Sequence, residues 1–164
     1  MKIRATNKVL NIARINAATD PAPLMDKMPG EWYASIVSTG LPGKLAIHFL
    51  HYPTLVSLII PEKSLNRAVN YIPDHLTALL NRKRFSMLLP QYEINTEPRI
   101  FSTNSKSMLG YLKEMKFNIE YHLFRQRPIT QIEDIEFDNI FGGKLAGNHY
   151  ARPIKILMEL REKL

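Results

Sequence analysis

A run of five polar residues has the side-chain types that bind small anions. The run consists of Thr103, Asn104, Ser105, Lys106 and Ser107. It links a strand-like segment at 97–103 to an apolar pattern of helical spacing that begins at Ser105 or Ser107. Asn and Ser side chains cap helix N-termini by accepting hydrogen bonds from the free amides of the first turn. The same amides, with a lysine beside them, attract phosphate or carboxylate. The run therefore predicts either a helix cap alone or an anion-binding corner.

The helix expected after this run carries two stripes. Its apolar residues recur at steps of three or four and predict a buried stripe: Met108, Leu109, Leu112, Met115, Ile119 and Leu123. A second stripe has the same spacing: Ser107, Tyr111, Glu114, Asn118, Tyr121 and Arg125. On this second stripe Glu114 has the chemistry of a general acid or base, and Asn118 offers a polar wall. Tyr111, Tyr121 and the strand residue Trp32 are candidates for stacking on a nucleic-acid base. A tryptophan on a strand is equally a core residue.

The charge of the chain favours a negatively charged partner. Its 164 residues include 22 lysines and arginines against 15 aspartates and glutamates, a formal net charge of +7. Such a balance attracts polyanions through phosphate neutralisation, although it also serves solubility. Basic residues outnumber acidic ones between 99 and 127: Arg99, Lys106, Lys113, Lys116, Arg125 and Arg127 stand against Glu114 and Glu120. The acids of 132–138 predict a solvated loop or a complement to the basic surface. We expect the phosphate contacts to come from Arg4, Lys8, Lys106 and Lys113.

Several kinds of chemistry are not indicated by the sequence. The chain has no cysteine, which rules out disulfides, a thiolate nucleophile and cysteine-ligated zinc. His48 and His51 are three apart on a predicted strand, so they point to opposite faces and cannot share a metal ion. The glycine-lysine segments at 40–45 and 142–147 lack the residues of a phosphate-binding Walker loop. We therefore expect no metal and no cofactor, and the lack of a catalytic motif favours a protein that is not an enzyme.

The hydrophobic pattern predicts a sheet in the first half of the chain. Strand-like segments stand at 2–6, 31–39, 44–52 and 54–61. The segment at 16–30, with its prolines and aspartates, is typical of a surface loop. The short turn at 40–43 and the tight junction at Pro53 predict that the last three of these strands form an antiparallel meander.

Helices dominate the second half. A helical pattern at 64–83 is interrupted at Pro73, which predicts one kinked helix or two short ones. Beyond the central helix, a glycine-rich loop at 141–153 leads into an amphipathic helix at 153–164. Together the elements predict an α+β fold, formed as a single domain over residues 1–164. We expect an antiparallel sheet of about four to five strands with helices packed on one face.

Four segments of the chain form a recognisable series of motifs: MKIRATNKVL, GEWYASIV, LVSLIIP and TNSKSMLGYLKEMKFNIEY. The series resembles a widespread family of uncharacterised bacterial proteins, a domain of unknown function with a TNxxSxLG-type motif. The matching positions are Thr6, Lys8, Trp32, Ala34, Asn104, Ser105, Ser107, Leu109 and Gly110. The resemblance runs from Met1 to about Leu123 and leaves a C-terminal extension at about 128–164. It implies that the N-terminal strand and the segment at 103–114 meet in space.

The chain departs from this family pattern at Lys113 and Glu114, where the family has Asn-Asp. A chemistry that requires the Asn-Asp pair is therefore not transferred to this chain. The resemblance also brings no activity with it, so it supports the position of a site and leaves its function open.

Three functions stay open at this point. The first is a non-enzymatic accessory protein that binds nucleic acid or another phosphate-bearing ligand. The second is a small enzyme on a phosphorylated or nucleotide-like substrate, with Lys106 holding an oxyanion and Glu114 as acid or base. The third is a protein–protein adaptor, such as a toxin–antitoxin or phage-related component, that docks through 153–164. Each is compatible with a homodimer. Without a visible signal peptide or a membrane-spanning stretch, we expect a cytoplasmic protein.

Overall fold

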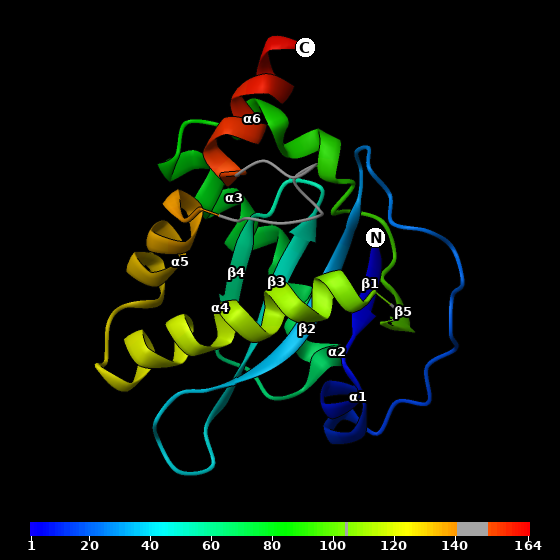
Figure 1. The fold of residues 1–164 in the computed structure, drawn as a ribbon, viewed down its shortest axis with the longest axis vertical. Coiled ribbons are helices and arrows are strands. Elements are labelled where there is room, and N and C mark those ends of the chain that lie inside the picture. Colours follow the sequence, from blue (N-terminus) through cyan, green and yellow to red (C-terminus); the bar gives the residue numbers. More distant parts are fainter. Residues whose placement is uncertain (104, 141–150) are drawn as a thin grey trace.

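A five-stranded sheet forms the centre of the fold (Figure 1). The computed structural model of the chain describes residues 1–103, 105–140 and 151–164. In sequence order the strands are β1 (Lys2–Ala5), β2 (Glu31–Ser38), β3 (Leu45–Tyr52), β4 (Ser57–Ile60) and β5 (Arg99–Ser102). In space they follow the order β4-β3-β2-β1-β5. The α+β class and the five strands are as the sequence predicted.

The sheet is mixed, and the expectation of a purely antiparallel sheet is wrong. The strands β2, β3 and β4 do form the antiparallel meander that the turns predicted. The N-terminal strand β1, however, lies between β2 and β5 and runs parallel to both. Hydrophobic pattern reports which residues face a core, not the direction in which a strand enters the sheet. The direction of β1 was therefore not visible in the sequence.

Helices cover both faces of this sheet, which corrects the expectation that they pack on one face. The helical segments are α1 (Asn7–Ala13), α2 (Leu65–Ala68), η1 (Val69–Tyr71), α3 (Ile72–Arg82), η2 (Ser86–Tyr92), α4 (Lys106–Phe124), α5 (Ile129–Asp138) and α6 (Pro153–Glu162). One core contains buried residues of α1, α2, α3 and η2. The other contains the buried residues of α4, which runs across the opposite face (Figure 1).

Alternation along the strands explains the two cores. On β2, Trp32, Ala34 and Ile36 belong to the core beneath α1 and α3, whereas Tyr33 and Val37 belong to the core beneath α4. Successive strand residues point to opposite faces, so a strand buried on both sides is apolar almost throughout. Nearly every residue of β2 and β3 is buried accordingly.

The acidic segment at 132–138 is not a loop but part of α5. Its Glu133 is 1% exposed and accepts a hydrogen bond of 3.1 Å from the backbone N–H of Ile59. Because β4 is an edge strand, this contact satisfies an amide that has no neighbouring strand. The carboxylate also pairs with Arg82 at 3.2 Å. The expected solvated loop is therefore a packed helix whose acids hold β4 and α3.

The remaining elements largely follow the pattern. Pro73 stands in the first turn of α3, where a missing amide is tolerated, so the predicted break separates α2 and η1 from α3. The final helix α6 packs on the body through buried Pro153 and Leu157. The glycine-rich loop predicted at 141–153 lies mostly outside the described residues. Within the described ranges, no helix is long and apolar enough to cross a bilayer.

Candidate functional site

The ends of two neighbouring parallel strands bring the predicted motifs together. Ala5 at the end of β1 pairs with Ser102 at the end of β5, and the Thr103 N–H donates to the Ala5 carbonyl at 3.0 Å. The implied meeting of the N-terminal strand and the 103–114 segment is thereby confirmed. From these adjacent ends, α1 leaves toward one face of the sheet and α4 toward the other.

The polar run performs the capping role that its residue types predicted. The Ser105 side-chain oxygen accepts the Met108 N–H at 3.2 Å and so caps α4. Lys106 and Ser107 are exposed in the first turn, while Thr103 is half-buried. Asn104 lies outside the described residues. Lys8 is exposed in the first turn of α1, at the neighbouring strand end. The anion-binding role of this corner stays a prediction.

Arg4 does not join Lys8 and Lys106 at the surface. Its side chain is fully buried, and its Nε donates to the Glu31 carboxylate at 2.8 Å. The guanidinium also donates to the Asp20 carbonyl at 3.0 Å and pairs with the Asp20 carboxylate at 3.3 Å. Tyr33 donates its hydroxyl to the other oxygen of Glu31 at 2.8 Å. Arg4 thus fastens the loop at 14–30 to the sheet.

Two of the candidate aromatic residues lie inside the protein. Trp32 is 1% exposed, with its ring centre 4.7 Å from that of His51 and 6.2 Å from that of Tyr92. The core interpretation of Trp32 therefore describes its position. Tyr111 is 7% exposed and packs in the core between α4 and the sheet. Burial raises the pKa of its hydroxyl above the usual value. Neither ring is placed to stack on a surface ligand.

The predicted second stripe on α4 divides between the inside and the outside of the molecule. Asn118 is half-buried, and its side-chain amide donates to the Glu136 carboxylate on α5. Glu114 is exposed. Tyr121 is 49% exposed, and the Arg125 guanidinium lies 4.5 Å from its ring centre. Of the predicted site residues on α4 and its C-cap, the exposed ones are Lys106, Ser107, Lys113, Glu114, Tyr121 and Arg125.

The outward side of α4 carries an exposed aromatic and basic stripe that sequence reasoning missed. The stripe follows steps of four and three residues: Lys106, Gly110, Lys113, Phe117, Tyr121 and Phe124. Phe117 is 67% exposed and Phe124 is 58% exposed. Neither residue belongs to the buried stripe that the sequence predicts, and this absence was the sequence signal that both rings are exposed. The prediction that Leu109 belongs to the buried stripe is wrong, because its side chain is 39% exposed. We call these six positions the α4 stripe.

Basic groups outnumber acidic ones around the α4 stripe, although Glu114 is also exposed beside it. Within the described residues, Lys106, Lys113 and Arg125 make no ion pair with a carboxylate. Of the nearby acids, Glu120 is engaged, because it accepts the Ser38 N–H at 2.7 Å and pairs with Lys116 at 3.6 Å. Unpaired cations beside exposed rings are the composition of surfaces that hold single-stranded nucleic acid.

Gly110 has no packing role in the described structure. A side chain added at this position would meet no atom within 4 Å. Glycine inside a helix costs about 1 kcal/mol relative to alanine, because it loses more backbone freedom on folding. Its φ is not in the left-handed region, so the backbone does not require glycine. The backbone of α4 is therefore uncovered at Gly110.

The histidines of the described ranges are not grouped as metal ligands would be. His48 contacts Ser57 on one face of the sheet, and His51 contacts Trp32 on the other, as their spacing predicted. The described ranges contain no cluster of three or more His, Cys, Asp or Glu side chains able to hold a metal ion.

Comparison with known families assigns the chain to one of them. A family model described as a domain of unknown function, DUF6933, matches residues 2–155. The chain belongs to this family. The DUF6933 match continues beyond Leu123, the point at which the sequence resemblance stopped, and includes all of α5. The α4 stripe and both strand ends also lie within it. No curated protein and no solved structure matches the chain.

Proposed function

We propose that this protein binds single-stranded nucleic acid along the α4 stripe and catalyses no reaction there. The observation that carries the proposal is the placement of Phe117, Tyr121 and Phe124, three exposed rings on one line of a helix. Every base has a flat face that stacks on such rings, and this contact requires the base to be unpaired. The rings therefore favour single strands over duplexes.

The spacing of the α4 stripe fits an extended strand. At a rise of about 1.5 Å per residue, Lys106 and Phe124 are about 27 Å apart along the axis of α4. Lys106 and Lys113 precede the rings, and Arg125 follows them. Each lysine or arginine that neutralises a phosphate releases a counterion, which gives binding its dependence on salt. Gly110 lets the strand approach the helix backbone between the two lysines.

The alternatives have less support in the structure. An enzyme with Glu114 as acid or base calls for an enclosed carboxylate, whereas Glu114 is exposed on the outer side of α4. An adaptor that docks through 153–164 calls for an apolar face on α6 that is free to bind. Several apolar residues of α6 pack on the two cores instead: Ile154, Ile156, Leu157 and Leu160.

The test is fluorescence anisotropy with labelled single-stranded RNA, single-stranded DNA and a duplex, over a series of salt concentrations. We expect single strands to bind more tightly than the duplex and binding to weaken steeply with salt. Tyr121→Ala is expected to weaken binding about fivefold or more, the range for loss of one stacked base. Tyr71→Ala is the matched control, because Tyr71 is also 49% exposed but lies on η1, at the other face of the sheet.

A second pair of variants tests the charges. Lys113→Ala is expected to reduce the slope of log affinity against log salt by about 0.7, the loss of one single-strand phosphate contact. Lys155→Ala, an exposed lysine on α6, is expected to leave the slope unchanged. The proposal fails if nothing binds at low salt, or if Tyr121→Ala and Tyr71→Ala behave alike.

A further inference from the structure

A separate cavity lies beyond the C-terminal end of α4. It has a volume of about 780 Å³ and opens between the β2–β3 turn and the α4–α5 turn. Leu45, Leu123 and Ile129 line it with apolar surface, and the segment at 61–63 forms another wall. Cavities of about 300–1,000 Å³ accommodate small organic ligands. The size and the apolar lining fit a small molecule rather than a single ion.

The charged groups around this cavity are predominantly basic. Lys44, Lys63 and Arg127 all line it, and within the described ranges none of them pairs with a carboxylate. The one acid in the lining, Glu62, is already engaged. One of its oxygens accepts the N–H groups of Lys63 at 2.8 Å and Ser64 at 2.9 Å. These contacts, together with Arg67, lower the pKa of Glu62.

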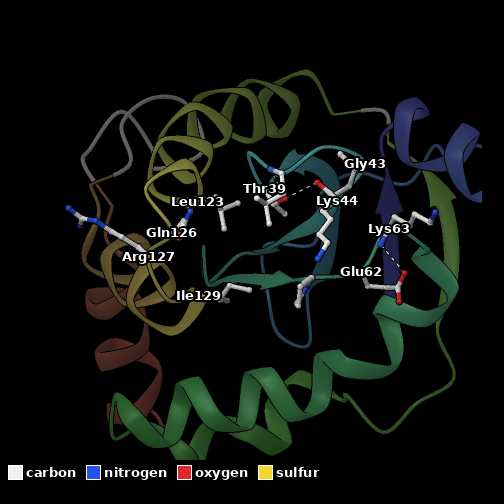
Figure 2. Close-up of a pocket in the computed structure, with 12 residues that line it drawn as sticks. Thr39, Gly43, Lys44, Glu62, Lys63, Leu123, Gln126, Arg127 and Ile129 are labelled. Atoms are coloured by element: carbon white, nitrogen blue, oxygen red, sulfur yellow. Dashed lines mark hydrogen bonds between the residues drawn. The ribbon is translucent and has the colours of Figure 1, made fainter.

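The lysines differ in where they point. Figure 2 shows the Lys44 side chain extending across the cavity toward the side on which Ile129 and Glu62 lie. In the same view Lys63 and Arg127 extend away from the centre of the cavity. An ammonium group above an apolar floor is the arrangement that binds a ligand with an anionic head and an apolar body.

We propose that this cavity binds a small amphiphilic anion, with its head group on Lys44 and its apolar body against Leu45, Leu123 and Ile129. The site is distinct from the α4 stripe and does not depend on nucleic-acid binding. Lys44 supplies the only cation directed inward among the described residues that line the cavity. Charge at that one position therefore decides whether an anion or a neutral molecule is preferred.

The experiment uses the full chain and the fluorescent probe anilinonaphthalene sulfonate, which has an aromatic body and an anionic head. We expect saturable binding of one probe per chain, and displacement by decanoate but not by decanol. Lys44→Met is expected to lower the affinity for the probe about tenfold, the effect of losing one hydrogen bond to a charged group. Lys63→Met removes a cation that points away, so it is the matched control and should leave affinity unchanged.

Two further measurements control for binding at another site and for unfolding of the variants. Phe117→Ser tests whether the probe binds the exposed rings of the α4 stripe instead of the cavity, and we expect no change. Melting temperatures of the variants show that each remains folded. The proposal is overturned if binding does not saturate, if Lys44→Met and Lys63→Met have equal affinities, if decanol displaces the probe as well as decanoate does, or if Phe117→Ser abolishes binding.

Discussion

Mild acid is expected to destabilise this protein through two buried histidines, His48 and His51. Burial lowers the pKa of each from 6.5 to about 3. The folded state therefore keeps both rings neutral, whereas the unfolded chain binds protons as the pH falls below about 6.5. The stabilisation is complete above that pH and is lost progressively between about 6.5 and 3. pH 5 lies about 1.5 units below the unfolded-state pKa, and each unit lowers the free energy of unfolding by about 1.36 kcal/mol per histidine. The two histidines together therefore lower it by about 4 kcal/mol.

The hydrogen bonds around His51 show why the neutral ring is preferred. Its Nε2 donates to the Pro29 carbonyl at 2.9 Å, because a carbonyl oxygen can only accept. Its Nδ1 is then an acceptor for the Thr54 hydroxyl at 2.7 Å, and that hydroxyl accepts from Tyr92 at 3.2 Å. A proton on Nδ1 would turn this nitrogen into a donor and so reverse its hydrogen bond with the Thr54 hydroxyl. His48 bonds to Ser57 through Nε2, while its buried Nδ1 has no partner in the described chain.

Urea unfolding followed by far-UV circular dichroism at pH 8 and pH 5 measures this effect. We expect the wild-type free energy of unfolding to fall by about 4 kcal/mol, a large part of the 5–15 kcal/mol typical of a domain. His48→Gln removes one of the titrating groups, so its decrease should be about half as large. At pH 8 the histidines are neutral, so any difference in unfolding free energy between this variant and the wild type there reports the change in packing and not the loss of a titrating group. Equal decreases in the two proteins would refute the reasoning.

Three further predictions concern single side chains. Arg4→Met should destabilise the fold by about 3–5 kcal/mol in urea unfolding, because it leaves the buried Glu31 carboxylate without its guanidinium; a double variant with Glu31→Leu should be less destabilised than the sum of the two single changes. Gly110→Ala should stabilise the protein by about 1 kcal/mol yet weaken oligonucleotide binding; unchanged binding would exclude close approach at this position. Burial raises the pKa of Glu136, so its ionised form opposes folding at neutral pH; Glu136→Gln should therefore raise the melting temperature at pH 8, with a smaller gain at pH 5.

The sequence predicted the elements of the fold better than their arrangement. Short-range signals located β2, β3 and β4 and their antiparallel order, since turns and hydrophobic runs are local properties. A further signal was present in β3, where LAIHFLHY has no alternation of polar and apolar residues. A strand of this kind is typically buried on both faces. That pattern argued for helices on both sides of the sheet.

The buried charges were beyond sequence reasoning. Glu133 is buried because its partners, the Ile59 N–H and Arg82, come from segments more than 50 residues away along the chain. Arg4 is buried for the same reason, since Glu31 and Asp20 reach it only once β1 lies beside β2. A charged residue is normally exposed unless it is paired, and pairing of this kind depends on the tertiary fold.

The α4 stripe raises the question of why a folded protein exposes two phenylalanine rings. Phe117 and Phe124 belong to neither buried core, so the packing of the sheet does not require Phe117. The Phe124 ring, by contrast, packs closely against Gly40: a Cβ added to Gly40 would lie 2.7 Å from the ring. Phe117 is therefore the cleaner test of function. We expect Phe117→Ser to change the free energy of unfolding by no more than about 0.5 kcal/mol, as surface changes usually do.

The same variant should weaken single-strand binding at least as much as Tyr121→Ala, because Phe117 is the more exposed ring. Stability and binding are then measured on one protein, and the two readings have different meanings. A loss of stability above about 1 kcal/mol would show that the ring supports the fold. Unchanged stability with unchanged binding would leave the stripe without its proposed partner. Unchanged stability with weakened binding is the combination that a functional surface requires, because such a residue contributes only when the partner is present.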